Sequence, residues 1–199
     1  MNKKAISWII LIALSLVWGS SFMLMKQGLK AFSSDEVAGL RITIASAFMF
    51  PFLIKHYKID LKTNLKGLLL MGVFGNLIPA FLFTKAETQI SSSLTGMLNA
   101  LTPMFTIMIG MIAFNHKITK SQIIGVLVGL VGAIALVALG DNKENDQTKN
   151  IMYSLLVAAA TLCYAISVNG IKAYLGHVNS LTATVWSFTI IGPMALKRI

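Results

Sequence analysis

Arg41 is the one arginine that falls within a long apolar run of this sequence. A charged side chain at the centre of a bilayer costs about 2.5–3.5 kcal/mol on insertion scales, so its place needs an explanation. Arg41 lies near the start of its run, and its long side chain can reach the membrane surface from there. The alternative is that Arg41 lines an outward-facing cavity, where it pairs with an anionic substrate or with a carboxylate such as Glu87.

Lys26 and Glu87 lie where apolar runs end, and both are candidates for ion coupling or charge pairing. Lys26 can also serve as a simple anchor at the membrane surface. All seven acidic residues fall in gaps or at the ends of runs, and Glu87 is the nearest candidate for a proton relay. The coupling ion stays open at this stage.

Trp18-Gly19-Ser20-Ser21 forms a polar step inside the first apolar run. Gly and Ser allow close helix packing or a local bend, and serine hydroxyls can bond back to the helix backbone. The indole of Trp18 beside them offers a surface on which an organic substrate could stack. Trp18, Ser20 and Ser21 are therefore predicted to line a substrate cavity, with plain helix packing as the alternative.

Asn99, Thr102 and Pro103 mark the predicted break in the fourth run. A proline within a helix removes one backbone hydrogen bond and frees the carbonyl four residues earlier. Broken helices often line the cavities of transporters, whereas hydrogen bonding between helices would be the simpler role. Asn76, next to Pro79, makes a weaker case of the same kind, and Tyr164 and Asn169 complete the predicted cavity residues.

Gly125, Gly129 and Gly132 lie roughly on one face of the fifth run, and Gly125-Val-Leu-Val-Gly129 fits the G-x-x-x-G pattern. Small residues at this spacing let two helices approach closely. This face is predicted to pack against another helix, either within the bundle or in a homodimer.

These residues must be positioned by helices in a membrane. The 199-residue chain is 56% hydrophobic and 12% charged, with a mean hydropathy of +0.76. A soluble domain of this size has too little interior for so much apolar surface, whereas a spanning helix needs about 20 such residues. The runs are residues 6–25, 37–54, 65–83, 94–114, 121–139, 151–171 and 181–196. They predict an all-α, multi-pass membrane bundle.

The charge and the metal-ligand residue types exclude several other classes. The net charge of +10 comes from lysines in short gaps between runs, not from a basic face with interleaved aromatics, so no nucleic-acid partner is expected. Cys163 is the single cysteine and the three histidines lie far apart in gaps, so neither a metal nor another cofactor is expected. Motifs such as H-E-x-x-H or the phosphate-binding loop are absent, so neither an enzyme nor an ATP-driven pump is predicted.

The distribution of lysines predicts a cytoplasmic N-terminus, because cytoplasmic loops carry the excess of Lys and Arg. In that orientation the outer gaps hold Lys26, Lys30, Lys85, Lys143 and Lys149, together with most acidic residues. The inner segments hold Lys3, Lys4, Lys55, Lys58, Lys62, Lys66, Lys117, Lys120 and Lys172. Only Lys197 and Arg198 break the pattern.

A six-residue ending recurs in the chain, as QGLKAF at residues 27–32 and NGIKAY at residues 169–174. The two copies end helices that lie five spans apart, so they must cross the bilayer in opposite directions. This is the arrangement of an inverted repeat, in which secondary transporters bind substrate at the repeat interface. The predicted units are a first repeat at 1–139, a polar linker at 140–150 and the start of a second repeat at 151–199.

Residues 18–32 (WGSSFMLMKQGLKAF) and 40–55 (LRITIASAFMFPFLIK) resemble the opening helix pair of the EamA-type transporters of the drug/metabolite transporter superfamily. Residues 91–136, with a mid-helix proline, a short turn and a glycine-spaced helix, resemble a later segment of that family. The resemblance covers essentially the whole chain, most strongly residues 8–139. The resemblance implies a secondary transporter of small organic metabolites or drug-like solutes, working by alternating access, with export as the expected direction. It also implies ten helices, so we expect this chain to be truncated after the seventh. Asn115-His116 stands where the family usually has Gly-Glu.

The predicted location is the bacterial cytoplasmic, or inner, membrane, and the predicted partners are the lipid bilayer, a small-molecule substrate and a second copy of the chain. An alternative function stays open. The chain could be a truncated, non-transporting membrane protein that acts through helix–helix association.

Overall fold

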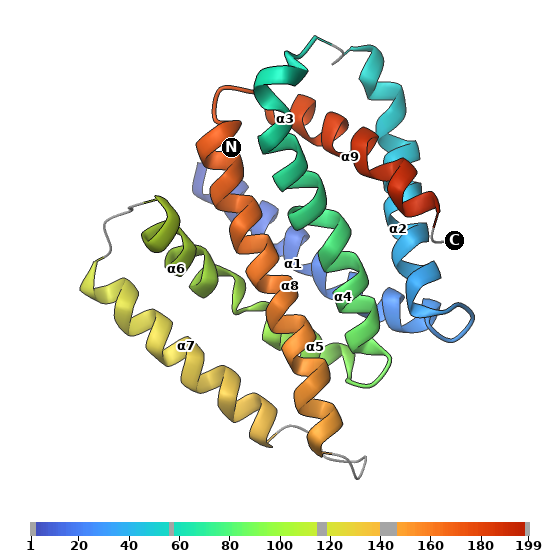
Figure 1. Cartoon of the computed structure of the whole chain (residues 1–199). Coiled ribbons are helices and arrows are strands. Elements are labelled where there is room, and N and C mark those ends of the chain that lie inside the picture. The colour runs from blue at the N-terminus through green and yellow to red at the C-terminus, as the bar shows by residue number, and fades with distance from the viewer. Residues whose placement is uncertain (1–2, 56–57, 115–118, 140–146, 198–199) are drawn as a thin grey trace.

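The computed structural model describes residues 3–55, 58–114, 119–139 and 147–197, and all the regular structure in these residues is helical (Figure 1). Each of the seven apolar runs forms one helix or a series of helical segments. The prediction of an all-α fold is therefore confirmed. The Asn115-His116 turn lies outside the described residues, as does most of the predicted linker at 140–150.

The helical segments follow one another with short connections. Their bounds are α1 (Lys3–Gly28), α2 (Ser34–Met49), the 3-10 segment η1 (Phe50–Ile54), α3 (Leu61–Leu69), the π-helical segment η2 (Leu70–Leu77), α4 (Ile78–Glu87), α5 (Ser92–Asn99), α6 (Thr102–Phe114), α7 (Lys120–Leu139), α8 (Gln147–Tyr174) and α9 (Ser180–Leu196).

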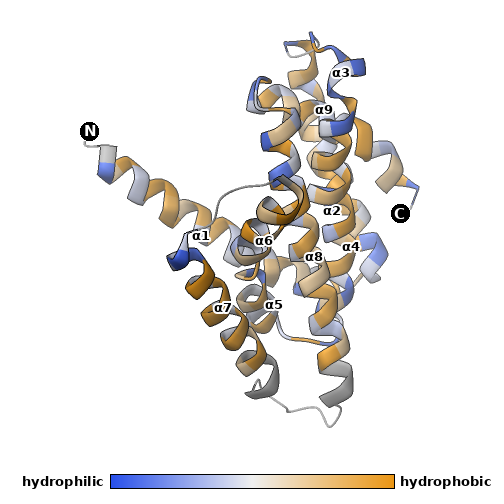
Figure 2. Ribbon diagram, turned by 60° about the vertical axis from the view of Figure 1, so that its left-hand side comes forward, coloured by the Kyte–Doolittle hydropathy of each residue, from blue (hydrophilic) through white to orange (hydrophobic). Residues whose placement is uncertain are grey.

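Five stretches of the described residues are long and apolar enough to cross a membrane: Lys4–Gly28, Ser34–Ile54, Leu61–Glu87, Ser92–Ala113 and Ile151–Tyr174. Two further apolar stretches, Lys120–Ala135 and Ser180–Leu196, are shorter. Hydrophobic residues run along the length of the helices in Figure 2, and hydrophilic residues gather mainly toward helix ends and connections. Continuous apolar helices with polar ends are what a bilayer requires.

Polar caps fix where several helices begin. The Ser33 hydroxyl accepts the backbone N–H of Glu36 at 3.3 Å, and the Glu36 carboxylate accepts the backbone N–H of Ser33 at 2.7 Å. This reciprocal capping box satisfies N–H groups that the first turn of α2 leaves free. Asp60 caps α3 in a similar way, and hydrogen bonds from Thr63 hold the pKa of its carboxyl below the usual range.

Helices α8 and α9 pack within the bundle formed by the helices that precede them. α8 packs most extensively against α4 and α6, and also against η2, while α9 lies against α2 (Figure 1). The main apolar core reflects this order, because Met25 of α1, Phe83 of α4 and Val157 of α8 belong to the same buried cluster. The division into two repeats stays a prediction from the sequence.

Glycines bring α8, α9 and the middle of the third run into close contact. A Cβ atom at Gly72 would lie 2.7 Å from the Ile191 side chain, and one at Gly75 would lie 2.5 Å from the Ser167 hydroxyl. Gly170 faces Leu70 in the same manner, at 2.8 Å. The sequence interpretation did not single out these glycines, which allow close helix packing here, as do Gly67 against Leu175 and Gly192 against Ser46.

The three glycines predicted to pack lie on an open face of α7. No atom lies within 4 Å of a Cβ atom placed at Gly125 or Gly132, and Gly129 only touches the Met104 sulfur at 4.0 Å. Within the described chain, then, Gly125 and Gly132 pack against no other helix, and the within-bundle form of the prediction is wrong for them. Their packing against a second copy stays a prediction.

The fourth run breaks where Asn99, Thr102 and Pro103 predicted. α5 ends at Asn99 and α6 begins at Thr102, whose hydroxyl donates a 2.8 Å hydrogen bond to the Asn99 carbonyl. Pro103 lies in the first turn of α6, where its missing N–H costs little.

The third run deforms differently. It stays helical through η2, whose wider turns precede Pro79 and relieve the contact between its ring and the preceding turn.

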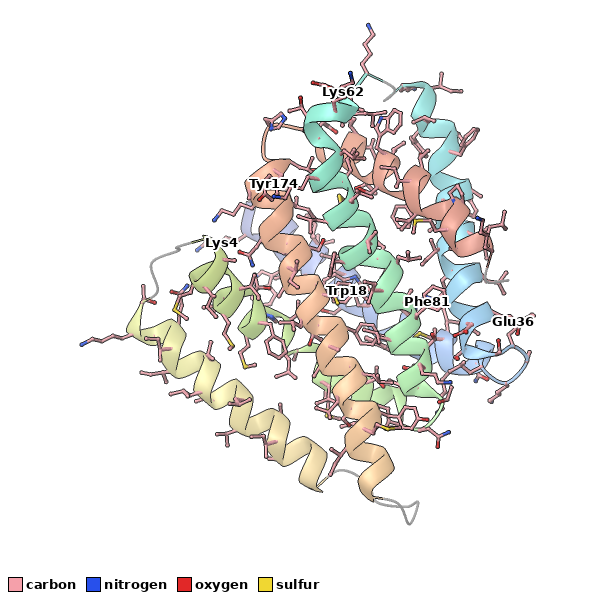
Figure 3. The ribbon with its side chains drawn as sticks, viewed as in Figure 1. Lys4, Trp18, Glu36, Lys62, Phe81 and Tyr174 are labelled. Atoms are coloured by element: carbon pink, nitrogen blue, oxygen red, sulfur yellow. The ribbon has the colours of Figure 1, made fainter. Side chains whose placement is uncertain are left out.

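The two copies of the repeated ending lie at opposite ends of the same rod, Leu61–Glu87. Lys26, just before QGLKAF, donates to the backbone carbonyls of Glu87 and Ile90, at the end of α4. Tyr174, the last residue of NGIKAY, accepts a 2.9 Å hydrogen bond from Lys66 in α3. Figure 3 shows Tyr174 of α8 toward the same end of the bundle as Lys62 of α3. This stretch of 27 residues is long enough to span a bilayer.

Candidate functional site

A groove of about 780 Å³ runs between α1 and the α5 segment. It combines two lysines and several hydroxyl and amide groups with aromatic and thioether side chains. The lining residues are Ser15, Trp18, Gly19, Phe22, Met23, Lys26, Gln27, Lys30, Ser92, Ser93, Gly96, Met97 and Asn99. Such a mixture of apolar walls and a few polar groups suits a small amphipathic solute.

The groove contains three of the residues predicted from sequence: Trp18, Lys26 and Asn99. Trp18 is 62% exposed, so the described chain leaves most of its ring uncovered on the groove side of α1. A second hollow of about 450 Å³, lined by residues such as Asp35, Phe81 and Met194, holds none of the predicted site residues.

Lys26 joins the groove to the end of α4. Its ammonium donates to the backbone carbonyls of Glu87 and, at 3.1 Å, of Ile90, while the side chain lines the groove. The Ser92 hydroxyl donates to the Phe22 carbonyl at 3.2 Å and ties α5 to α1 nearby. The positive end of the groove is therefore held in place from three helical segments.

Arg41 does not reach the groove. Its guanidinium lies against α1, 2.8 Å from the Met25 sulfur and 3.4 Å from the Ser21 hydroxyl. The expected hydrogen-bonded pair with Glu87 is not formed, because both carboxylate oxygens of Glu87 lack a hydrogen-bond partner. Arg41 instead clamps α1 to α2 at the helix surface.

Ser20, Ser21 and Tyr164 also lie outside the groove. The Ser20 hydroxyl donates back to the Val17 carbonyl at 3.1 Å, as expected for serine inside a helix. Tyr164 lies behind Phe22, which lines the groove. The ring centroids of Phe22 and Phe83 are 5.6 Å apart in an edge-on contact, and those of Phe83 and Tyr164 are 5.8 Å apart. An aromatic row thus supports the groove wall from α8.

Asn76 and Asn169 satisfy backbone groups inside the bundle. The Asn76 amide donates to the Met71 carbonyl at 3.0 Å, within the π-helical turns of η2. The buried Asn169 amide donates to the Thr106 carbonyl of α6 at 3.0 Å and to Ala165 of its own helix at 2.9 Å. Both side chains therefore form hydrogen bonds to the backbone, the simpler of the two roles considered for such residues, and neither lines the groove.

Asn169→Ala should weaken the contact between α8 and α6 only modestly. Hydrogen bonds between membrane helices average about 0.6 kcal/mol in double-mutant cycles, since the unfolded helices also find partners. We expect a small fall in the midpoint of detergent-induced unfolding. A matched Asn99→Ala variant loses only a long hydrogen bond of 3.4 Å, from the nearby Thr102 hydroxyl, so the midpoint should stay close to that of the wild type. A large loss for Asn169→Ala would contradict this assignment.

Apart from Trp18, Lys26 and Asn99, the residues that line the groove were not predicted as site residues; Phe22, Ser92 and Met97 are examples. The run Ser91-Ser92-Ser93 is the signal that could have drawn attention to this segment, because three hydroxyls between apolar runs are unusual. In the part of the chain that the structure describes, no three His, Cys, Asp or Glu side chains gather as a metal site would require.

Comparisons with known proteins give a family match and several relatives. Residues 4–138 match the EamA-like transporter family. An uncharacterized transporter of Archaeoglobus fulgidus is 25% identical over 177 residues, which cover 89% of this chain and 61% of that protein. A probable amino-acid metabolite efflux pump of Salmonella typhimurium is 27% identical over 184 residues, covering 92% of this chain and 60% of the pump.

An uncharacterized inner membrane transporter of Escherichia coli K12, YedA, is 29% identical over 162 residues, with 78% of this chain and 49% of that protein covered. No solved structure matches. The chain thus spans about three fifths of the length of the first two relatives. The family match covers more than half of the chain, and it agrees with the multi-pass apolar helices. The chain belongs to the EamA-like transporter family of membrane proteins.

Proposed function

We propose that this chain is a secondary transporter, or part of one, that exports small organic solutes across the bacterial cytoplasmic membrane by alternating access. The observation that carries the proposal is the groove between α1 and α5, where Lys26 and Trp18 face the same space. An ammonium beside an indole suits a solute with a carboxylate and an apolar body. Relatives named as probable amino-acid metabolite efflux pumps support both the solute class and the direction.

Two further features support the inverted repeat and the orientation that the proposal assumes. The repeated endings lie at opposite ends of the Leu61–Glu87 rod, as an inverted repeat requires. The lysine distribution favours a cytoplasmic N-terminus, with Lys62 and Lys66 at the inner end and Lys26 at the outer end. The proposal includes no catalytic step, because a solute or ion gradient supplies the driving force.

The groove must be wet and accessible if it binds solutes, and a single cysteine tests this. In a Cys163→Ala background, Met97→Cys places a thiol in the groove, and Ile112→Cys places one on the exposed surface of α6 outside it. A charged, water-soluble thiol reagent should label Met97→Cys on the order of tenfold faster, because only a thiol in contact with water ionises readily. Phenylacetate should slow the labelling of Met97→Cys. Equal rates at the two positions, with no protection, would refute the proposed binding site.

A homodimer is the second candidate, favoured by the open glycine face of α7. Gly125 and Gly132 meet no other part of the described chain, although they carry the spacing typical of close helix pairs. If association is the function, as in the alternative of a non-transporting membrane protein, Gly129→Leu should abolish chemical cross-linking between copies. Unchanged cross-linking in Gly129→Leu would count against this face as the interface.

A further inference from the structure

Glu87 ends α4 as a fully buried carboxylate, with 0% of its side chain exposed and no hydrogen-bond partner for either oxygen. Among the acidic residues that the structure describes, Asp35 and Asp60 are exposed and Glu36 is half-buried. Each of these three has a hydrogen bond to its carboxylate. Glu87 is thus the one described acid that is fully buried with both carboxylate oxygens outside hydrogen-bonding geometry; the Ser92 hydroxyl acts on it, but donates its hydrogen bond to the Phe22 carbonyl instead.

Two cations act on this carboxylate from neighbouring helices. Lys26 comes from α1 and Arg41 from α2, and the positive charge of each reaches Glu87 electrostatically. Ser92 of α5 lies nearby, and α8 contributes Tyr164 behind Phe83. Arg41 is engaged with Met25 and Ser21, so Lys26 is the cation whose position can respond to the groove.

Lys26 contacts both the end of α4 and the groove. Its ammonium is bound to the backbone carbonyls of Glu87 and Ile90, and its side chain also lines the groove. A solute carboxylate in the groove would attract this ammonium, because charge-assisted hydrogen bonds are stronger than those to neutral carbonyls. A buried carboxylate left by its nearest cation must then gain another positive charge or a proton.

We propose that Glu87 is a proton-binding residue whose occupancy is set by Lys26. When an organic anion enters the groove and pairs with the Lys26 ammonium, Glu87 takes one proton from water and becomes a neutral carboxylic acid. When the anion leaves, Lys26 returns to the carbonyls and the proton is released to water. Anion and proton therefore bind together, and the bound pair adds no net charge. This inference rests on the proposed function only in that the groove binds an organic anion.

Proton uptake on binding is the direct test, with the full chain in nanodiscs, a weakly buffered solution and a pH-indicator dye. Phenylacetate is the probe, and neutral phenylacetamide is its matched control. We expect about one proton to be taken up per phenylacetate bound, as linkage requires, and none with phenylacetamide. Glu87→Gln should bind phenylacetate without uptake, whereas the exposed-acid variant Asp35→Asn should behave like the wild type.

Uptake that persists unchanged in Glu87→Gln, or phenylacetate binding without uptake in the wild type, would overturn the inference and leave the proposed function standing. Failure of both probes to bind the wild type would instead overturn the proposed function, and the inference with it. If Glu87→Gln does not fold, the infrared carboxylic-acid band of the wild type decides. Phenylacetate should increase that band in the wild type and in Asp35→Asn, and a band insensitive to phenylacetate would overturn the inference.

Discussion

Replacing Gly72 by leucine should prevent α9 from packing on the third run. A Cβ atom at this position already lies 2.7 Å from the Ile191 side chain and 3.2 Å from the Ser187 carbonyl oxygen, and both residues are buried. The backbone carbonyl cannot turn away as a flexible side chain could. Overpacking of this kind costs about 1–3 kcal/mol and occasionally more, and leucine adds three further carbons beyond Cβ.

We expect Gly72→Leu to lower the stability in detergent by at least about 1–3 kcal/mol, seen as a lower midpoint of thermal unfolding and a broader peak in size-exclusion chromatography. Gly125→Leu is the matched control, because nothing lies within 4 Å of a Cβ atom there. That variant should be as stable as the wild type or up to about 1 kcal/mol more stable, since leucine favours helix over glycine. Equal behaviour of the two variants would contradict the described packing of α9.

Lys26→Met should remove the anion-binding end of the groove. The substitution keeps the length of the apolar stem but deletes the ammonium that the groove and the carbonyls of Glu87 and Ile90 share. Hydrogen bonds to charged groups contribute about 1.5–3 kcal/mol, which corresponds to a loss of about tenfold or more in affinity. Binding of phenylacetate, measured by protection of Met97→Cys from labelling, should therefore weaken by at least about that factor.

Two comparisons separate recognition from folding in this experiment. Lys85→Met removes an exposed lysine near the same end of the bundle and outside the groove, so its binding should match the wild type. Lys26→Arg keeps the charge and should retain part of the affinity. If Lys26→Met binds phenylacetate as tightly as Lys85→Met does, Lys26 does not recognise the anion.

Hydropathy alone predicted the helices, because each apolar run is continuous and the gaps are short and polar. Proline chemistry predicted the break between Asn99 and Thr102, where the chain does leave the helix. The π-helical turns at 70–77 were not predicted, since the chain keeps bonding as a helix there and Asn76 bonds within those turns. Proline thus identified both irregular places but not which distortion each would take.

The faces of the helices could not be predicted from the sequence. A helix that is apolar all round gives no periodic signal for its inner side, so lipid-facing and packed residues look alike. Gly125 and Gly132 therefore suggested packing where α7 is open, while Gly72 and Gly170 carry the close contacts. The direction of Arg41 and the burial of Glu87 depend on how α1, α2 and α4 meet, which no local pattern specifies.

Solute flux through reconstituted protein tests the central claim most directly. Liposomes containing the full 199-residue chain are loaded with a mixture of amino-acid metabolites and aromatic carboxylates, and the released solutes are followed by mass spectrometry. If the chain transports, at least one carboxylate-bearing solute should leave faster than from protein-free liposomes, and Lys26→Met should abolish the difference while Lys85→Met keeps it. Release that is no faster than from protein-free liposomes, for every solute in the mixture, would contradict the claim that this chain transports such solutes by itself.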